Sequence, residues 1–266
     1  MRQTRTDEKI QALSKQGKFL EIARAEKSDI TWKLYNFNLK KGTLKFILNA
    51  TMDTLPTNQN LLQWGKSPTD KCPFCGNKQT TLHILNNCKP ALDQGRYTYR
   101  HDSIVNYIAK SLDKTKATFY ADIEGFKTET NGTIPPSITI TAERPDIVII
   151  DNKNKNLKVF ELTVPFETNI NERHNQKQEK YQHLITDIED FKVSIEAFEI
   201  GSRGFITTDN ANRLKTIHKY CKEGTKFKTF RNKVSALAVN TSYVIFQNRK
   251  DKSWNDPPLL LPPFTR

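Results

Sequence analysis

The segment from Arg144 to Pro165, "RPDIVIIDNKNKNLKVFELTVP", predicts a β-hairpin. A β-branched run leads into a polar break rich in Asn and Lys, and a second apolar run returns from it. If the turn is centred between Lys153 and Asn154, the hairpin register places Asp146 directly opposite Glu161. A hairpin with covered faces would hold apolar residues there, so these two acids need an explanation.

Two carboxylates at opposed positions have Cβ atoms roughly 5 Å apart. One member of such a pair stays protonated unless a cation lies between them. Because two carboxylates and water suit Mg²⁺ or Mn²⁺, the pair predicts a divalent metal site formed by Asp146 and Glu161. The pairing depends on the register, because a slip of one residue would separate the two acids. The alternative interpretation is a solvated edge hairpin in which the acids are incidental.

The sequence after the hairpin predicts one helix over residues 171–191. With about 100° per residue, Lys177 lies on its apolar stripe and Lys180 at the margin. The stripe also contains Tyr181, Leu184, Ile185 and Ile188. A lysine beside paired acids could orient the attacking water or stabilise a phosphoryl transition state. Alternatively, Lys177 extends to the surface.

Composition indicates a polar chain with an anionic partner. The chain has 266 residues, enough for one or two domains, and a net charge of +13. Neither a membrane span nor a secretion signal is predicted. Basic residues gather between Asn212 and Lys233, with Tyr220, Phe227 and Phe230 interleaved, which suits nucleic-acid binding. The candidate contacts are Arg213, Lys215, Lys219, Lys222, Lys226, Lys228, Arg231 and Lys233.

A second candidate metal site is the window "CPFCGNKQTTLHILNNC". Its donors are Cys72, Cys75, His83 and Cys88, which can supply the tetrahedral corners of a Zn²⁺ site. Gly76 permits the tight turn after the second cysteine. The interpretations left open are a nucleic-acid-binding knuckle and a purely structural zinc site. Cys221 stands apart and is predicted to be a core thiol.

The remaining pattern predicts helices over 7–27, 42–55, 94–112, 209–222 and 228–248 and a short segment capped by Thr57. Strands are expected over 138–143 and, broken at Gly201–Gly204, over 192–207. A Pro-rich tail follows.

An acid after proline, an acid on the next strand and a nearby lysine resemble the PD-(D/E)xK pattern, although Thr163 stands where lysine is usual. The blocks "LPTNQNLLQWGK", "TLHILNNCKPALDQGRYTYRHDSIV", "RPDIVIID", "ELTVPFETNI", "RHNQKQEKY" and "EIGSRGFIT" accompany it in order. Together with the cysteine window they resemble the C-terminal part of non-LTR retrotransposon proteins that carry a restriction-like endonuclease. The resemblance extends from about Leu44 to Trp254.

The resemblance implies an α/β fold: a restriction-endonuclease-like mixed central sheet flanked by helices, preceded by a helical segment and a small zinc knuckle. The expected boundaries are a helical linker segment at 1–66, a CCHC zinc knuckle at 67–92, the endonuclease domain at 93–250 and the tail at 251–266. The missing lysine comes from the "KQEKY" block, as Lys177 or Lys180, and Tyr181 belongs to the same block. Asp102, in "RHDS", is the candidate third metal ligand, or else a helix-surface residue. His101 and His174 flank the site and are expected to be structural hydrogen-bonders.

The expected activity is Mg²⁺-dependent nicking of target DNA, which leaves a 3′-hydroxyl that primes reverse transcription. RNA and a reverse transcriptase domain of a larger protein are the further expected partners, and the expected location is nuclear for a eukaryotic element and otherwise intracellular. Two alternatives stay open: a catalytically silent DNA- or RNA-binding module of the same fold, and a junction-resolving nuclease.

Overall fold

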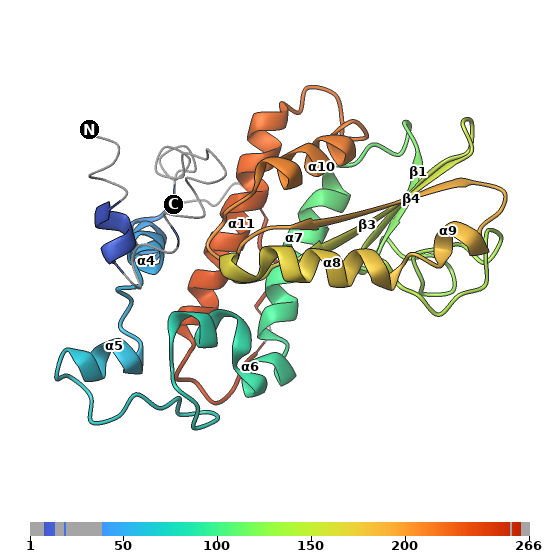
Figure 1. Cartoon of the computed structure of the whole chain (residues 1–266). Helices are drawn as coiled ribbons and strands as arrows, with labels where there is room; N and C mark the ends of the chain where they lie inside the picture. The colour runs from blue at the N-terminus through green and yellow to red at the C-terminus, as the bar shows by residue number, and fades with distance from the viewer. Residues whose placement is uncertain (1–7, 14–18, 20–38, 256, 262–266) are drawn as a thin grey trace.

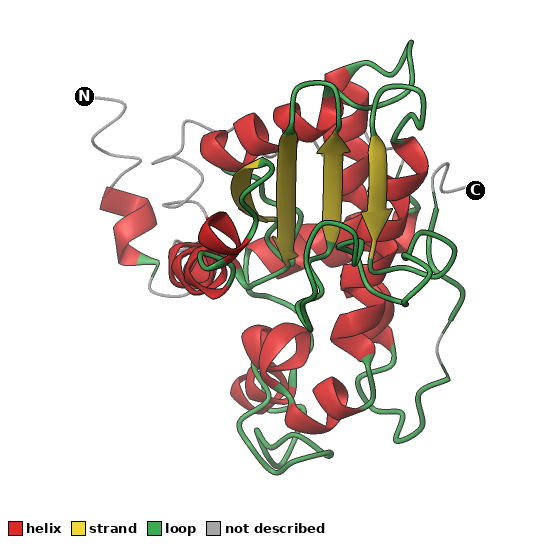
Figure 2. Cartoon of the chain, turned by 90° about the vertical axis from the view of Figure 1, so that its right-hand side faces the viewer, coloured by secondary structure: helices red, strands yellow, loops and turns green. Residues whose placement is uncertain are grey.

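The computed structural model describes residues 8–13, 19, 39–255 and 257–261. Its centre is a four-stranded mixed sheet with the order β1-β2-β3-β4 (Figure 2). The strands are β1 (Thr118–Ala121), β2 (Ile147–Asp151), β3 (Asn156–Thr163) and β4 (Lys192–Glu199). The β1–β2 and β2–β3 pairs are antiparallel, whereas β3 and β4 run parallel. The molecule is therefore mixed α/β, with helices flanking one sheet.

The hairpin register predicted from the sequence is confirmed. Ile147 pairs with Phe160, and Asp151 pairs with Asn156 across the turn. Asp146 directly precedes β2, so the same register places it beside Glu161 of β3. This pairing brings the two predicted acids to one end of the sheet.

Helices cover the sheet, and α4, α5 and α6 lie to one side of it (Figure 1). Before it lie α4 (Lys41–Thr51), α5 (Asn58–Gln63), the π-helix η1 (His83–Asn87), α6 (Lys89–Asp93) and α7 (Arg96–Ser111). After β3 come the 3₁₀-helix η2 (Glu167–Asn169), α8 (Ile170–Lys180), α9 (Leu184–Asp187), α10 (Thr208–His218) and α11 (Phe227–Gln247). The Thr57 cap is confirmed, because its side chain accepts the Asn60 N–H. No described helix is long and apolar enough to cross a membrane.

The two faces of the sheet pack on different helices. Phe160 and Leu162 of β3 join a cluster with residues of α7, α10 and α11. Val159, which precedes Phe160 and points to the other face, joins the opposite cluster with Tyr181 and Leu184, the residues that follow α8 and open α9. Because both faces are covered, β2 is apolar over nearly its whole length. Glu161 lies on the side of α8.

The segment predicted as a helical linker also packs against the rest of the chain. Phe46 and Ile47 of α4 form a cluster with Ala236 and Val239 of α11. The helix predicted over 7–27 lies mostly outside the described residues. In its described part, residues 8–12 are helical. In the described part of the Pro-rich tail there is neither helix nor strand. The proposed domain boundaries stay predictions.

Three secondary-structure predictions were wrong. Residues 138–143 form no strand, because β1 occupies the free edge of β2 and Ile140 is left 94% exposed. Residues 205–207 form no strand either, since β4 ends at Glu199. The helix expected over 171–191 breaks after Lys180 and resumes as α9. Ile185, at the margin of the predicted stripe, is exposed as a result.

Candidate active site and metal centre

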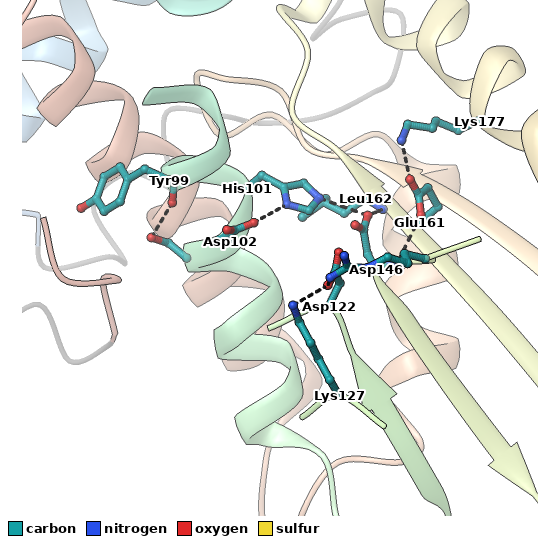
Figure 3. A network of polar contacts seen from close by, with 11 residues as sticks. Tyr99, His101, Asp102, Asp122, Lys127, Asp146, Glu161, Leu162 and Lys177 are labelled. Carbon is teal, nitrogen blue, oxygen red and sulfur yellow. Dashed lines mark hydrogen bonds and ion pairs between the residues drawn. The ribbon is translucent and has the colours of Figure 1, made fainter. Parts of the chain in front are cut away.

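At the end of the hairpin, the carboxylates of Asp146 and Glu161 each accept a hydrogen bond from a backbone N–H of the opposite strand (Figure 3). The Asp146 N–H donates to Glu161 Oε2 at 3.2 Å, and the Leu162 N–H donates to Asp146 Oδ2 at 2.7 Å. Asp146 is 8% exposed and Glu161 is 3% exposed. The cross-strand register therefore holds two nearly buried acids side by side, as the sequence predicted.

Of the two candidate lysines, Lys177 contacts a hairpin acid. Its Nζ forms an ion pair with Glu161 Oε1. Lys180 instead forms an ion pair with Glu143 at 3.5 Å and donates to the Tyr181 hydroxyl at 2.7 Å. Tyr181, directly after α8, is buried, and burial together with the charge of Glu161 raises the pKa of its phenol. The helical spacing of Lys177 and Tyr181 accounts for both facing the sheet.

The surroundings of the two acids shift their pKa values in opposite directions. Burial and the charge of Asp146 raise the pKa of Glu161, although Lys177 opposes them. Burial also acts to raise the pKa of Asp146, but the His101 imidazolium and the Leu162 N–H outweigh it, so the pKa of Asp146 is lowered. Without a metal, Asp146 holds the negative charge and Glu161 is the member that resists ionisation.

His101 of α7 lies between Asp146 and Asp102 (Figure 3). Its Nε2 is 3.0 Å from Asp146 Oδ2, and its Nδ1 is 2.9 Å from Asp102 Oδ1. Burial lowers the pKa of His101, but the two carboxylates overcome this and raise it to about 10. The residue that contacts Asp146 directly is His101, and the "RHD" sequence was the signal for it. Asp102 contacts His101, and its role as a third metal ligand stays a prediction.

Glu199 at the end of β4 is an acid that the sequence reasoning missed. It pairs in register with Thr163 and is buried, and its Oε1 lies 3.2 Å from Nδ1 of His174 on α8. Arg213 lies 4.0 Å from its other oxygen. An acid at the end of an apolar run, just before "IGSRG", was the available signal. His174 thus fastens α8 to β4, which agrees with its expected structural role.

The four donors of the cysteine window converge. One ligand atom from each of Cys72, Cys75, His83 and Cys88 lies within 4.8 Å of all the others. Cys72 Sγ is 3.9 Å from Cys88 Sγ, and Cys75 Sγ is 3.3 Å from His83 Nε2. His83 and Cys88 are five residues apart, which is one turn of the π-helix η1. Gly76 adopts φ +74° in the turn, as expected.

The chemistry of this set fits Zn²⁺. Burial raises the pKa of the Cys88 thiol to about 12 and lowers the pKa of His83. Neutral imidazole is the form that binds a metal, and a cation reverses the penalty on the buried thiolates. The group can therefore bind a zinc ion. The Tyr97 hydroxyl of α7 accepts the Cys88 N–H at 3.0 Å and so anchors the module to the body of the protein.

Only some of the basic residues predicted to contact nucleic acid are exposed in the structure. Lys215, Lys219, Lys222, Lys226 and Lys228 are exposed on α10, the start of α11 and the loop between them, whereas Arg231 and Lys233 are half-buried. Arg213 forms an ion pair with Glu199. Of the interleaved aromatic rings, Tyr220 and Phe227 are half-buried, whereas Phe230 is fully buried and stacks on Tyr107, with ring centroids 5.7 Å apart. Cys221 is buried in the main core, as predicted.

The sequence matches no protein-family model and no curated protein. What the structure defines is thus a mixed α/β protein with a Cys₃His cluster and a hairpin acid pair contacted by a lysine and a histidine. The relation to restriction-like endonucleases rests on the residues and motifs alone.

Proposed function

We propose that the chain is a metal-dependent DNA endonuclease of the restriction-like type. The observation that carries the proposal is the contact set at the end of the hairpin: Asp146 beside Glu161, with Lys177 on Glu161. An acid pair with a raised pKa on one member is costly to keep in a fold and suits a site that works with a cation. The order of the motifs along the chain supports the same class.

In this proposal Asp146 and Glu161 would hold Mg²⁺ or Mn²⁺, which suits carboxylate ligands. His101 and the Leu162 N–H fix Asp146 Oδ2, and no hydrogen bond from the described residues reaches Oδ1, which is left for the cation. A bound divalent cation would polarise the phosphate and lower the pKa of the attacking water. Lys177, which pairs with Glu161, would be placed to orient that water or to stabilise charge on the phosphate, while the buried Tyr181 lies on the apolar side. Hydrolysis then leaves a 5′-phosphate and a 3′-hydroxyl.

The test is nicking of supercoiled plasmid DNA in Mg²⁺. Asp146→Ala is expected to abolish nicking while DNA binding survives, because Asp146 holds the metal and not the DNA. Asp122→Ala is the matched control, since Asp122 lies next to the site but pairs with Lys127 and Arg144 instead. Equal nicking by the wild type and Asp146→Ala would sink the assignment.

The 3′-hydroxyl left by such a nick would prime reverse transcription, with the polymerase supplied by a larger protein and its RNA. The motif resemblance supports this placement in a retrotransposon protein. A junction-resolving nuclease would share the chemistry, and equal cutting of branched and linear DNA would count against it.

A second candidate is a catalytically silent DNA- or RNA-binding module. It is favoured because most carboxylate oxygens of the pair already have protein partners. Asp146 Oδ2 accepts from His101 and the Leu162 N–H, and both Glu161 oxygens are also bonded. Binding of Mn²⁺ measured by calorimetry separates the two. A nuclease should bind the ion through Asp146 and lose that binding in Asp146→Ala, whereas a silent module should bind none there.

A further inference from the structure

A cleft of about 320 Å³ lies beside the hairpin acids, between the Cys₃His module and α8. Its walls come from two stretches that are distant in sequence: one runs from η1 to α7, and the other from the end of β3 to α8. It opens next to His101, which contacts Asp146, and Lys177, which contacts Glu161. A ligand in the cleft would thus lie next to the reacting phosphate of the proposed function.

The cleft is suited to an anion. No Asp or Glu lines it, whereas Arg100, His101, Arg173 and Lys177 do. Arg100 of α7 is 1% exposed, and the carboxylate whose charge acts on it, Glu167, forms its ion pair with Arg203 instead. The Arg100 guanidinium donates to Ser242 Oγ at 3.0 Å and to the Val164 carbonyl at 3.2 Å, while its Nε has no partner. A buried cation that has no ion pair of its own is costly, and an anionic ligand would supply one.

The cleft also offers groups that suit a nucleobase. Asn86 of η1 donates through Nδ2 to the Val164 carbonyl at 2.8 Å, and its Oδ1 has no partner. Asn87 is exposed at the rim, and the Thr163 hydroxyl also lacks a partner. Amide side chains carry both donors and acceptors, as base edges do.

The size of the cleft separates single strands from duplexes. Pockets of about 300–1,000 Å³ hold small ligands, and this one is at the low end. A nucleotide is a ligand of that class, whereas a duplex, whose major groove alone is about 12 Å wide, cannot enter.

We propose that this cleft holds one unpaired nucleotide of the DNA strand next to the cleaved phosphate, and that the chain therefore prefers DNA with a single-stranded segment. Arg100 and Arg173 would neutralise its phosphate, and Asn86 and Asn87 would contact its base. The proposal rests on the proposed function for the position of the phosphate, but binding alone tests it.

The experiment is fluorescence anisotropy with the full chain, without added divalent metal. The probes are a blunt DNA duplex, the same duplex with a short single-stranded DNA overhang, and the same duplex with an RNA overhang. The wild type is expected to bind the DNA overhang about tenfold more tightly than the blunt duplex, since one held base accounts for such a factor.

The double variant Asn87→Ala/Arg173→Ala should lose this preference and keep its affinity for the blunt duplex. Both side chains are exposed, so folding is not at risk. For the overhang probe, the slope of log K against log salt should fall by about 1, because one phosphate contact is removed. The control is Lys192→Ala, an exposed lysine at the far end of β4 from Glu199, which should keep the preference.

Three outcomes would overturn the proposal: equal wild-type affinity for blunt and overhang DNA, an unchanged preference in the double variant, or tighter binding of the RNA overhang. A chain that prefers the DNA overhang but never nicks DNA would retain the cleft assignment and lose only the nuclease. A chain that nicks DNA but shows no preference for the overhang would retain the nuclease and lose the cleft assignment.

Discussion

Replacing Glu161 with glutamine should make the protein more stable while abolishing its nicking of DNA. Glu161 is nearly buried, and burial and the charge of Asp146 raise its pKa. The folded state therefore binds a proton more tightly at this acid than the unfolded chain does. This tighter proton binding contributes to the stability of the folded state. The contribution is fully present below the pKa of the unfolded chain and is lost as the pH rises through the pKa of the folded state. At neutral pH the wild type bears this cost, and the neutral amide does not.

The magnitude follows from the contacts of Glu161. Each unit by which a pKa is raised costs about 1.4 kcal/mol once the acid is ionised. The ion pair with Lys177 opposes this cost and is already part of the raised pKa; because that side chain is 30% exposed, the pair contributes only about 0–1 kcal/mol. The Asp146 N–H keeps an acceptor in the amide oxygen. The net expectation is a stabilisation of roughly 1 kcal/mol, or about 2–4 °C in Tm.

The assay is thermal unfolding of the wild type and Glu161→Gln from acidic to neutral pH without added divalent metal, with plasmid nicking alongside. The difference in Tm should be near zero at acidic pH and grow as the pH rises. Glu167→Gln is the control, because Glu167 is also buried but forms an ion pair with the buried Arg203 at 2.6 Å. It should lose about 3–5 kcal/mol. If Glu161→Gln lost stability as Glu167→Gln does, or still nicked DNA, the reasoning would be refuted.

Three further outcomes are expected. Purified protein should contain roughly one zinc ion per chain by metal analysis; Cys75→Ser should lose the ion and lower the Tm, whereas Cys221→Ser, a change in the main core, should keep the ion. Gly204→Ala should reduce stability in chemical denaturation by about 3 kcal/mol, since φ is +83° and a Cβ would lie 2.6 Å from the nearest side-chain atom; Gly224→Ala, at φ +77° with open space around it, should lose only about 1 kcal/mol. Asp102→Asn should slow nicking about 10–100-fold rather than abolish it, because Asp102 acts on Asp146 through His101. A complete loss would instead support Asp102 as a metal ligand.

Local patterns determined much of this protein. Alternating side chains and a polar break were enough for the hairpin and its register, because a slip of one residue would move every apolar side chain to the wrong face. The spacing of Cys72, Cys75, His83 and Cys88 predicted a cluster that does converge. The spacing of Lys177 along α8 placed it toward the sheet, where it contacts Glu161.

The tertiary structure decided what the local pattern leaves open. Residues 138–143 alternate like a strand, but an edge can pair only once, and β1 pairs with β2 there. Phe230 stands among lysines in the sequence, yet the packing of α11 on α7 buries it. His101, rather than Asp102, contacts Asp146, because neighbouring residues on a helix point about 100° apart and only the docking of α7 on the sheet selects one. Periodicity is a property of one segment, whereas edge pairing, burial and convergence depend on which segments meet.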